Sequence, residues 1–390
     1  MKRWLGSAPW PLERLPSLML LISLVGLVEL TRTGLYTVYL PRNLGPYLGL
    51  GAVGLAASVQ YLADTLGRSP GGHLSEYFGL RRVLPLAAAL AATSALGILY
   101  APSGWWLLLA SLANGLFIAP LWPAMMTYSS RSARGGEDGR AIGFTQSLVA
   151  PFIGIGVLLT GFLYDRDPRL AAAALTGIQI LVFLAGAAIA AFFREERPFH
   201  TPSGFPWRKV AILAPGALAQ LLAFGLLAPV FFPFMDRLGL ETRDLVLALA
   251  LGGGLEYLLI SPLGRVADRY GYRLTLIPAL IMAALAITAF AEIKNLGGLI
   301  IAALAAGAAQ ALLIPSWGGL VSSTLPDEFK ARAWGALMSL EGLGFAIGPV
   351  LGGFAWELWG QRAPFWIGAA AYILVASFYA IRLFRRPAGA

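Results

Sequence analysis

Long apolar runs recur along the whole chain, separated by short breaks that carry Arg, Asp, Gly and Pro. Each run has about 20 residues, which is enough for one helix to cross a bilayer core of about 30 Å. Only 13% of the residues are charged and 58% are hydrophobic, whereas about 25% are charged in ordinary soluble domains. We therefore predict an all-α membrane protein with twelve transmembrane helices. The predicted spans are about 17–40, 48–70, 83–101, 105–128, 141–164, 170–192, 210–235, 244–263, 274–292, 297–320, 333–356 and 364–381.

The distribution of Lys and Arg predicts the orientation of these spans. If the N-terminus lies inside, the inside segments hold 20 basic residues and the outside segments hold 7. Only Arg32 and Arg68 fall within predicted spans. This bias places both termini in the cytoplasm and predicts a multi-pass protein of the inner (cytoplasmic) membrane. The net charge of +9 is not gathered on a soluble module, so nucleic acid is not an expected partner.

The chain repeats itself at an offset of 192 residues. SPGGHLSEYFGLRR (69–82) returns as SPLGRVADRYGYRL (261–274), and GFLYD (161–165) falls on GFAWE (353–357). We predict two six-helix halves, 1–193 and 210–390, joined by a basic cytoplasmic linker at 194–209.

Three stretches of the repeat carry a recognisable pattern of Gly, Pro and charge. The first is GGHLSEYFGLRR (71–82), the second is its copy GRVADRYGYR (264–273), and the third is GFAIGPVLGG (344–353) in the eleventh span. The first two resemble the signature loop of the major facilitator superfamily, and the third resembles the Gly-x-x-x-Gly-Pro-x-x-Gly-Gly motif of its antiporters. The resemblance covers the whole chain and implies a 6+6 helix fold that transports by alternating access.

The chain departs from that family at several motif positions. Glu76 replaces the usual Asp of the first loop, and Tyr77 replaces the usual Arg. Val157 stands where the helix 5 motif has proline, and Ser111 stands where helix 4 of family antiporters has an Arg that governs a proton site. An Arg-governed site of that kind is therefore excluded here.

The loop signatures point to gating rather than to substrate binding. Small residues let helix ends approach closely, and an acid with nearby Arg side chains bridges helix termini on the cytoplasmic side. The expected gating residues are Gly72, Glu76, Gly79, Arg81, Gly264, Asp268, Arg269, Gly271 and Arg273. In the eleventh span, packing and coupling roles are both open for Gly344, Gly348, Pro349, Gly352 and Gly353.

Charged residues inside the spans are the candidate substrate and proton site. A charge at a helix centre costs about 3 kcal/mol, so such groups face a cavity or a partner. Glu29 and Arg32 share one face of the first helix, and Asp64 can reach either Arg68 or Arg32. A salt bridge that only fixes packing is the competing interpretation, although buried ion pairs stabilise poorly. Two acids of the second half, Glu256 and Glu341, complete the candidate set.

An acid-x-x-Arg pair in helix 1, with an Asp 32 residues after the Arg, is similar to the lipoteichoic-acid-anchor glycolipid flippases of the superfamily. By position, that resemblance assigns Glu29, Arg32, Asp64 and Trp122 to a hydrophilic pocket for a sugar headgroup, with protons driving the cycle. The acids Glu256 and Glu341 depart from the mostly apolar C-terminal pocket of those proteins.

Together these features predict a secondary active transporter that is coupled to protons and exports or flips an amphipathic substrate, a glycolipid or a drug-like compound. A symporter or facilitator that imports a small polar solute is the alternative, and a non-transporting membrane receptor or enzyme is the alternative of another class. The chain has no Cys and no phosphate-binding GxxxxGK[ST] motif. We therefore expect no enzyme, no metal and no cofactor besides the coupling proton, and we expect a monomer whose partners are membrane lipids and its substrate.

Overall fold

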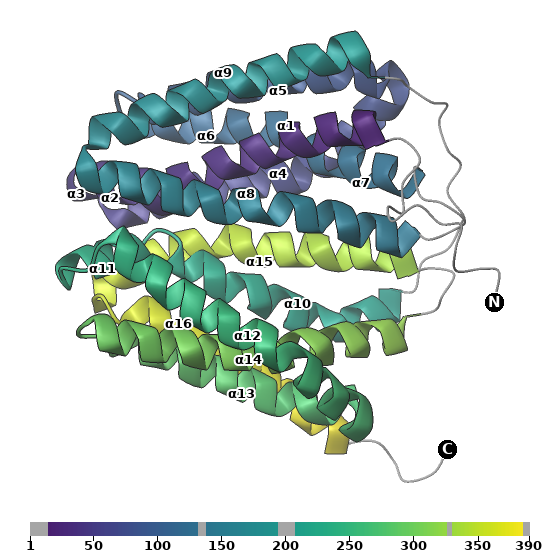
Figure 1. Cartoon of the computed structure of the whole chain (residues 1–390), viewed down its shortest axis with the longest axis vertical. Helices are drawn as coiled ribbons and strands as arrows, with labels where there is room; N and C mark the ends of the chain where they lie inside the picture. The colour runs from purple at the N-terminus through teal and green to yellow at the C-terminus, as the bar shows by residue number, and fades with distance from the viewer. Residues whose placement is uncertain (1–14, 132–137, 194–206, 326–329, 385–390) are drawn as a thin grey trace. The chain divides into compact units, whose positions relative to one another are not determined.

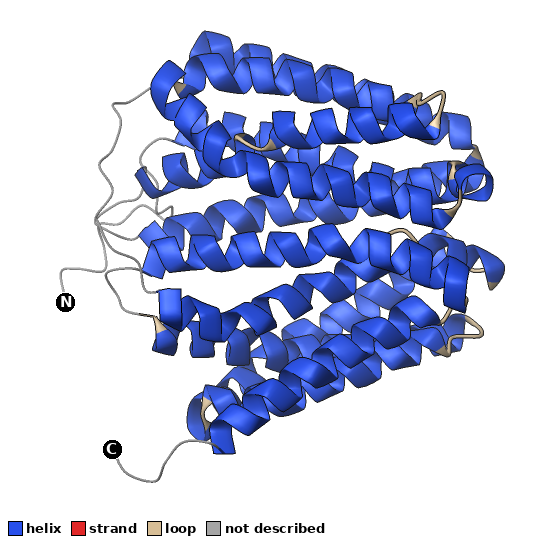
Figure 2. Cartoon of the chain, turned by 180° about the vertical axis from the view of Figure 1, so that it is seen from behind, coloured by secondary structure: helices blue, strands red, loops and turns tan. Residues whose placement is uncertain are grey.

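The computed structural model describes residues 15–131, 138–193, 207–325 and 330–384 (Figure 1). Throughout these ranges the regular structure is helical and no strand is present (Figure 2). The all-α prediction from apolar periodicity is therefore confirmed.

The N-terminal part contains nine α-helices and one π-helical segment among the described residues. They are α1 (Leu15–Thr33), η1 (Gly34–Tyr39), α2 (Leu40–Asn43), α3 (Gly45–Leu48), α4 (Leu50–Phe78), α5 (Leu80–Leu99), α6 (Gly104–Ile118), α7 (Leu121–Arg131), α8 (Asp138–Arg166) and α9 (Pro168–Phe192). Side-chain caps fix several starts, because an N-cap oxygen satisfies a backbone N–H that the helix leaves unpaired. Ser103 accepts from the Trp106 amide before α6, and Asp167 accepts from the Arg169 amide before α9.

The C-terminal part contains seven described helices. They are α10 (Trp207–Leu227), α11 (Phe231–Arg237), α12 (Thr242–Tyr270), α13 (Tyr272–Ala291), α14 (Leu296–Thr324), α15 (Lys330–Trp359) and α16 (Ala363–Phe384). A capping box of Glu241 and Asp244 starts α12, and Asn295 caps α14. Because α10 begins at Trp207, the last three residues of the predicted linker are helical; residues 194–206 lie outside the described part of the chain.

The sequence repeat is reproduced by the helix boundaries. Both α4 and α5 begin and end 192 positions before α12 and α13. Each hairpin turns at one glycine, Gly79 with φ +85° and Gly271 with φ +90°. Only glycine adopts this backbone conformation without strain, so these two predicted loop residues are what end α4 and α12.

Eleven helices among the described residues are long and apolar enough to cross a membrane. They include every predicted span except the second, which corresponds to α4. Polar residues such as Gln60 and Asp64 lower the hydropathy of α4. The helix that looks least like a membrane span is thus one that carries a candidate site residue.

The prediction that residues 69–78 form a loop is wrong. These residues continue α4, and 261–270 continue α12, with Pro70 and Pro262 inside the helices. The expected close approach at Gly72 is also wrong, because a Cβ there would meet no atom within 4 Å. The close contact lies one residue earlier, where a Cβ on Gly71 would be 3.1 Å from Pro120. At Gly264 the nearest contact, with Pro315 at 3.7 Å, is an ordinary one.

Contacts between Cα atoms divide the chain into two compact units. The first comprises Met1–Tyr39 and Leu62–Thr201, and the second comprises Leu40–Tyr61 and Pro202–Ala390. Helix pairing is the same in each: α1 packs on α8 as α10 packs on α15, and α5 packs on α6 and α9 as α13 packs on α14 and α16. Segment 40–61, predicted in the N-terminal half, belongs to the second unit, where the Gly51 amide donates to Glu357.

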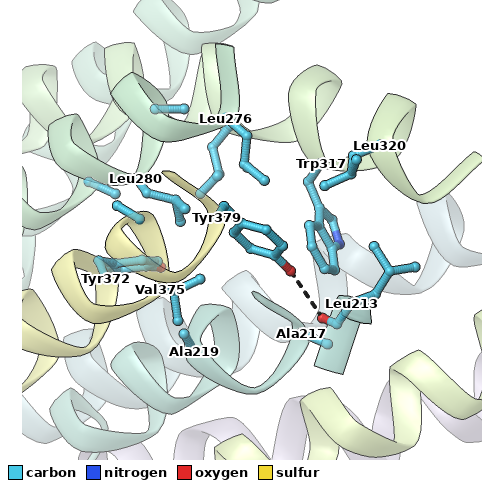
Figure 3. Close-up of a cluster of buried hydrophobic side chains, with 14 of the residues drawn as sticks. Leu213, Ala217, Ala219, Leu276, Leu280, Trp317, Leu320, Tyr372, Val375 and Tyr379 are labelled. Atoms are coloured by element: carbon cyan, nitrogen blue, oxygen red, sulfur yellow. Dashed lines mark hydrogen bonds between the residues drawn. The ribbon is translucent and has the colours of Figure 1, made fainter. Parts of the chain in front are cut away.

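Each unit has its own apolar core. The core of the first unit is formed by residues of α1, α5, α7 and α9, such as Leu24, Leu84 and Val182. In the second unit, Figure 3 shows Tyr379 between Trp317 and α10, with its hydroxyl directed at the Leu213 carbonyl. The same hydroxyl lies 3.3 Å from the Ile212 carbonyl, so it bonds to the turn of α10 just before Pro215.

Glycines bring helices into close contact at equivalent places in the two units. Gly156 of α8 lies against the Leu30 carbonyl of α1, and its repeat partner Gly348 of α15 lies against Gly225 of α10. Gly344 and Gly352, one turn to either side of Gly348, meet the Leu218 and Leu226 carbonyls of α10. Gly353 faces Leu50 of α4, and the Pro349 carbonyl lies against Gly54. The antiporter-like motif of α15 is therefore placed as a packing surface, because small residues let helix backbones touch.

We expect Gly156→Ala to lower the stability of the folded protein. The new Cβ would overlap the Leu30 carbonyl and the Thr33 hydroxyl, and overpacking of this kind costs about 1–3 kcal/mol. Gly154→Ala is the matched control on the same helix, because nothing lies within 4 Å of a Cβ there. That control should equal the wild type or gain up to about 1 kcal/mol from helix propensity. Thermal unfolding in detergent measures both, and equal melting temperatures for the two variants would contradict the contact.

Candidate functional site

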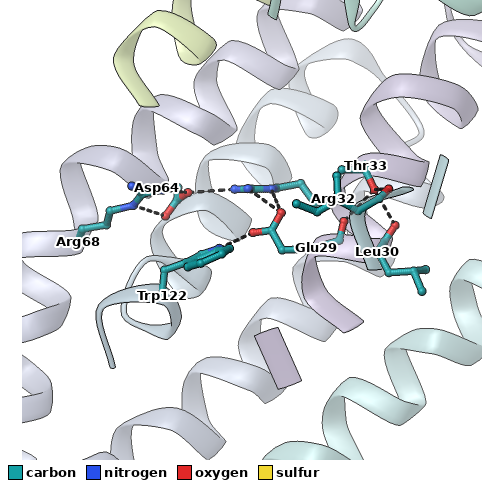
Figure 4. A network of polar contacts seen from close by, with 8 residues as sticks. Glu29, Leu30, Arg32, Thr33, Asp64, Arg68 and Trp122 are labelled. Atoms are coloured by element: carbon teal, nitrogen blue, oxygen red, sulfur yellow. Dashed lines mark hydrogen bonds and ion pairs between the residues drawn. The ribbon is translucent and has the colours of Figure 1, made fainter. Parts of the chain in front are cut away.

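A buried row of charged side chains crosses the first unit between α1 and α4 (Figure 4). Arg32 donates to Glu29 Oε2 from Nε at 3.1 Å and from Nη2 at 2.7 Å. Its Nη1 donates to Asp64 Oδ2 at 3.0 Å. Asp64 also accepts from Arg68, at 3.0 Å from Nη2 and 3.3 Å from Nε. The order of charges is acid, base, acid, base, and the four formal charges sum to zero.

Trp122 of α7 contacts the row at Glu29, its first member. Its Nε1 donates to Glu29 Oε1 at 2.6 Å. Glu29 is 2% exposed and Asp64 is 1% exposed, whereas the side chains of Arg32 and Arg68 are 12% and 25% exposed. The guanidinium groups are thus the accessible members of the row, and the carboxylates lie behind them.

Local helix geometry explains why the row forms. Glu29 and Arg32 are three residues apart on α1, and Asp64 and Arg68 are four apart on α4, so each pair shares a helix face. Just after Arg32 the helix changes to the π-helical segment η1. Short π-helical segments occur frequently at functional sites. Thr33 marks this transition, because its hydroxyl donates to the Glu29 carbonyl and to Ile153 of α8.

A layer of neutral polar side chains beside Arg32 was not predicted from the sequence. Gln179 of α9 donates to the Thr31 hydroxyl at 2.8 Å, and Asn114 of α6 donates to the Ala91 carbonyl at 3.1 Å. With Arg32, these residues line a small cavity of about 10 Å³, which is about the smallest space that holds one water molecule. The sequence indicated a role for Gln179 or Asn114 only in that each is a single amide side chain within an apolar run.

Ser111 shows what replaces the Arg of family antiporters in helix 4. It is fully buried and accepts a hydrogen bond from the Tyr36 hydroxyl at 2.9 Å. The position therefore joins α6 to η1 by a neutral contact and carries no charge.

The two acids of the second unit are placed differently from those of the first. Glu256 lies on α12 and Glu341 lies on α15, both partly exposed. Neither forms an ion pair within the described ranges. Glu341 lies beside Trp317 of α14, whose Nε1 is buried without a hydrogen bond of normal geometry among the described residues. Within the part of the chain that the structure describes, these acids therefore have no basic partner like Arg32.

Of the predicted gating residues, Arg81 lies at the start of α5, and its Nε donates to the Ala190 carbonyl near the end of α9 at 2.8 Å. In the second copy, Asp268 accepts from the Tyr272 hydroxyl at 2.8 Å, and the Arg269 guanidinium lies 5.7 Å from the Tyr270 ring centre. Arg273 makes no hydrogen bond or ion pair among the described residues. The side chain of Glu76 lies outside them.

The chemistry available to the row is binding and proton exchange. In the described part of the chain there is no group of three or more His, Cys, Asp or Glu that would hold a metal ion. Each carboxylate accepts three hydrogen bonds out of about four that it can take. A row of alternating donors and acceptors matches a ligand whose groups both donate and accept.

Comparison with known proteins gives relatives of nearly full length. The chain is 23% identical over 344 residues to the proton-coupled antiporter flippase LtaA of Staphylococcus saprophyticus, covering 86% of each protein. It is 22% identical over 381 residues to the LtaA flippase of Staphylococcus aureus, covering 93% of each. Among solved structures, the nucleoside transporter NupG superposes with a TM-score of 0.67 at 14% identity, covering 95% of this chain. At that identity the likeness concerns the fold alone.

A family model matches two overlapping stretches of the chain, 21–256 and 213–390, and is described as the Major Facilitator Superfamily. Together the two matches span nearly the whole chain. The protein therefore belongs to the Major Facilitator Superfamily and is a multi-pass membrane transporter.

Proposed function

We propose that the protein is a proton-coupled antiporter that flips or exports an amphipathic molecule with a polyhydroxy head, such as a glycolipid. The buried row Glu29–Arg32–Asp64–Arg68 is the observation that carries the proposal. The names of the relatives, proton-coupled antiporter flippases, support the same class of activity.

The proposed layout is twelve spans in two repeats of six, with both termini in the cytoplasm and the protein a monomer in the inner membrane. The repeated boundaries of α4 and α5 in α12 and α13 support the two-fold arrangement. The excess of Lys and Arg on alternate loops supports the orientation. In this layout α4 is a span, and the ion pairs of Asp64 compensate for its lower hydropathy.

A neutral polyhydroxy head fits the row better than an ion does. A cation would be repelled by Arg32 and Arg68, and an anion would be repelled by Glu29 and Asp64. A hydroxyl group both donates and accepts, so a row of hydroxyls can accept from the guanidinium groups and donate to the carboxylates. The partly exposed Arg32 and Arg68 are the groups that such a head meets first.

Competition for the same oxygens supplies the antiport coupling. A protonated carboxyl at Glu29 or Asp64 loses its ion pair with Arg32 and also loses an acceptor for a substrate hydroxyl. Proton and substrate therefore weaken each other's binding, and by linkage the effect is reciprocal. Exclusive binding of this kind lets protons that enter the cell drive the substrate outward.

We expect the double variant Glu29→Gln/Arg32→Gln to remain folded and to lose transport. Removing Arg32 alone leaves buried carboxylates without their cation, and breaking a buried pair costs about 3–5 kcal/mol. The double variant removes one charge of each sign and keeps the Asp64–Arg68 pair. Counterflow of a glycolipid in proteoliposomes measures transport, and monodisperse elution in detergent checks the fold. Arg169→Ala, at an exposed position, is the control. Wild-type counterflow by the double variant would reduce the pair to a packing role.

A variant at Asp64 provides the second test. We expect it to lose proton coupling and to keep part of its affinity for the glycolipid. We expect wild-type affinity for the glycolipid to fall as pH is lowered, since protons compete for the carboxylates. In Asp64→Asn/Arg68→Gln, which again preserves the charge balance, binding should depend less on pH, and uphill transport driven by a pH gradient should be reduced at least tenfold. Titration of binding against pH, together with transport with and without the gradient, separates the two effects. If the variant still concentrates substrate against its gradient, another carboxyl carries the coupling proton. Glu341→Gln is then the next variant to measure.

The chemical class of the substrate is tested by competition. Glycolipids and sugar-headed detergents should displace a bound fluorescent glycolipid, because they present both the hydroxyl row and an apolar tail. Free monosaccharides and amino acids should not displace it at the same concentration. Tight binding of a small hydrophilic solute that no amphiphile displaces would instead indicate an importer of polar solutes.

A further inference from the structure

The first unit contains a second, larger cavity that the ion-pair row does not touch. Its volume is about 660 Å³, within the range of about 300–1,000 Å³ that is usual for ligand sites. Its lining comes from α4, α5 and the junction of α6 and α7, and includes Leu66, Leu74, Phe78, Arg82, Leu86 and Leu90. Arg82 is the only charged side chain among these lining residues. We call this cavity the α4–α5 groove.

The groove follows the hairpin of α4 and α5. The helices are joined at Gly79, so Phe78 and Arg82 lie at its open end, and Leu66 and Leu90 lie at its far end. From Arg82 to Leu90 the groove runs along eight residues of helix, or about 12 Å.

Small residues make room for the groove, and the junction of α6 and α7 forms its floor. A Cβ added to Gly67 would be 2.8 Å from Ala119, so α4 rests on that junction. A slot of this length with apolar walls matches an extended hydrocarbon chain rather than a polar molecule.

The walls of the groove are apolar and open. Leu66, Leu74 and Leu86 are each half exposed or more. In a membrane-spanning unit such a face is covered by hydrocarbon, because no water is present there to do so. The natural occupant is therefore an acyl chain.

The open end of the groove carries positive charge that no described side chain neutralises. Arg82 is exposed and makes no hydrogen bond or ion pair among the described residues. Arg81, beside it, is held by the Ala190 carbonyl, and the N-terminus of α5 adds its own positive partial charge. Basic groups at a membrane surface attract anionic lipids.

We propose that the α4–α5 groove is a binding site for an anionic phospholipid, with one acyl chain along the groove and the phosphate on Arg82. The site is separate from the proposed headgroup site at Arg32, and it does not depend on which substrate the protein transports.

The absence of cysteine makes a direct test possible with single-cysteine variants. Leu86→Cys places a fluorophore in the groove, and Leu109→Cys on α6 is the control, because the two leucines are 61% and 62% exposed and Leu109 does not line the groove. The labelled full-length protein is reconstituted into vesicles in which spin-labelled phosphatidylglycerol or phosphatidylcholine carries the quencher on an acyl chain. At position 86 we expect at least threefold stronger quenching by phosphatidylglycerol than by phosphatidylcholine at equal mole fraction. At position 109 we expect equal quenching.

A second variant tests the headgroup contact. Adding Arg82→Gln to Leu86→Cys should abolish the preference for phosphatidylglycerol while leaving elution in detergent unchanged. Equal quenching by the two lipids at position 86 would overturn the proposal and leave a groove filled by any lipid. A preference that survives Arg82→Gln would also overturn it, because the charge recognition would then lie elsewhere.

Discussion

A charge in an apolar environment has to find its partner within the protein, and Arg32 meets this requirement by lying between two carboxylates. Through Glu29 and Asp64 it ties α1 to α4, and through Glu29 and Trp122 the same row reaches α7. Three helices that are separate in sequence are therefore held in one register by a few hydrogen bonds. Buried ion pairs stabilise no better than well-packed apolar residues, so packing alone does not explain why this row exists.

Comparison of the two repeats distinguishes residues that pack the helices from residues that belong only to the charged row. Both units contain a glycine contact between equivalent helices: Gly156 of α8 lies against α1, and Gly348 of α15 lies against α10. The positions in the second repeat that correspond to Glu29 and Arg32 are occupied by Leu221 and Phe224. The same helix packing is thus achieved without the ion pairs, which supports the proposal that the charged row serves function and not packing.

Hydrophobic length made the helices predictable, and helical spacing made the Glu29–Arg32 contact predictable. The sequence was less informative where tertiary contacts override local signals. The second predicted span ends at about residue 70, yet α4 continues to Phe78 and ends where Gly79 takes a backbone conformation with φ +85°. Gly72 was singled out by its motif, whereas the packing contact belongs to Gly71.

Apart from the Arg32–Asp64 contact, contacts between distant residues could not be predicted from the sequence. Gln179 meets Thr31 across 148 positions, and Arg42 donates two hydrogen bonds to Asp236 across 194. Nothing local to either member of these pairs indicates the other, because the separation is set by how the helices pack and not by any period in the sequence.

Charge balance gives the row a property that bears on energy coupling. With both carboxylates ionised and both guanidinium groups charged, the four residues carry no net charge, and a neutral polyhydroxy head leaves that sum unchanged. One added proton gives the row a net charge of one unit. In the proposed cycle the proton-loaded state is therefore the only charged one, and only that state is driven by the membrane potential, by about 2.3 kcal/mol for each 100 mV. The step in which the proton-loaded protein returns would then draw on both the pH gradient and the potential, while the substrate-loaded step would not depend on the potential.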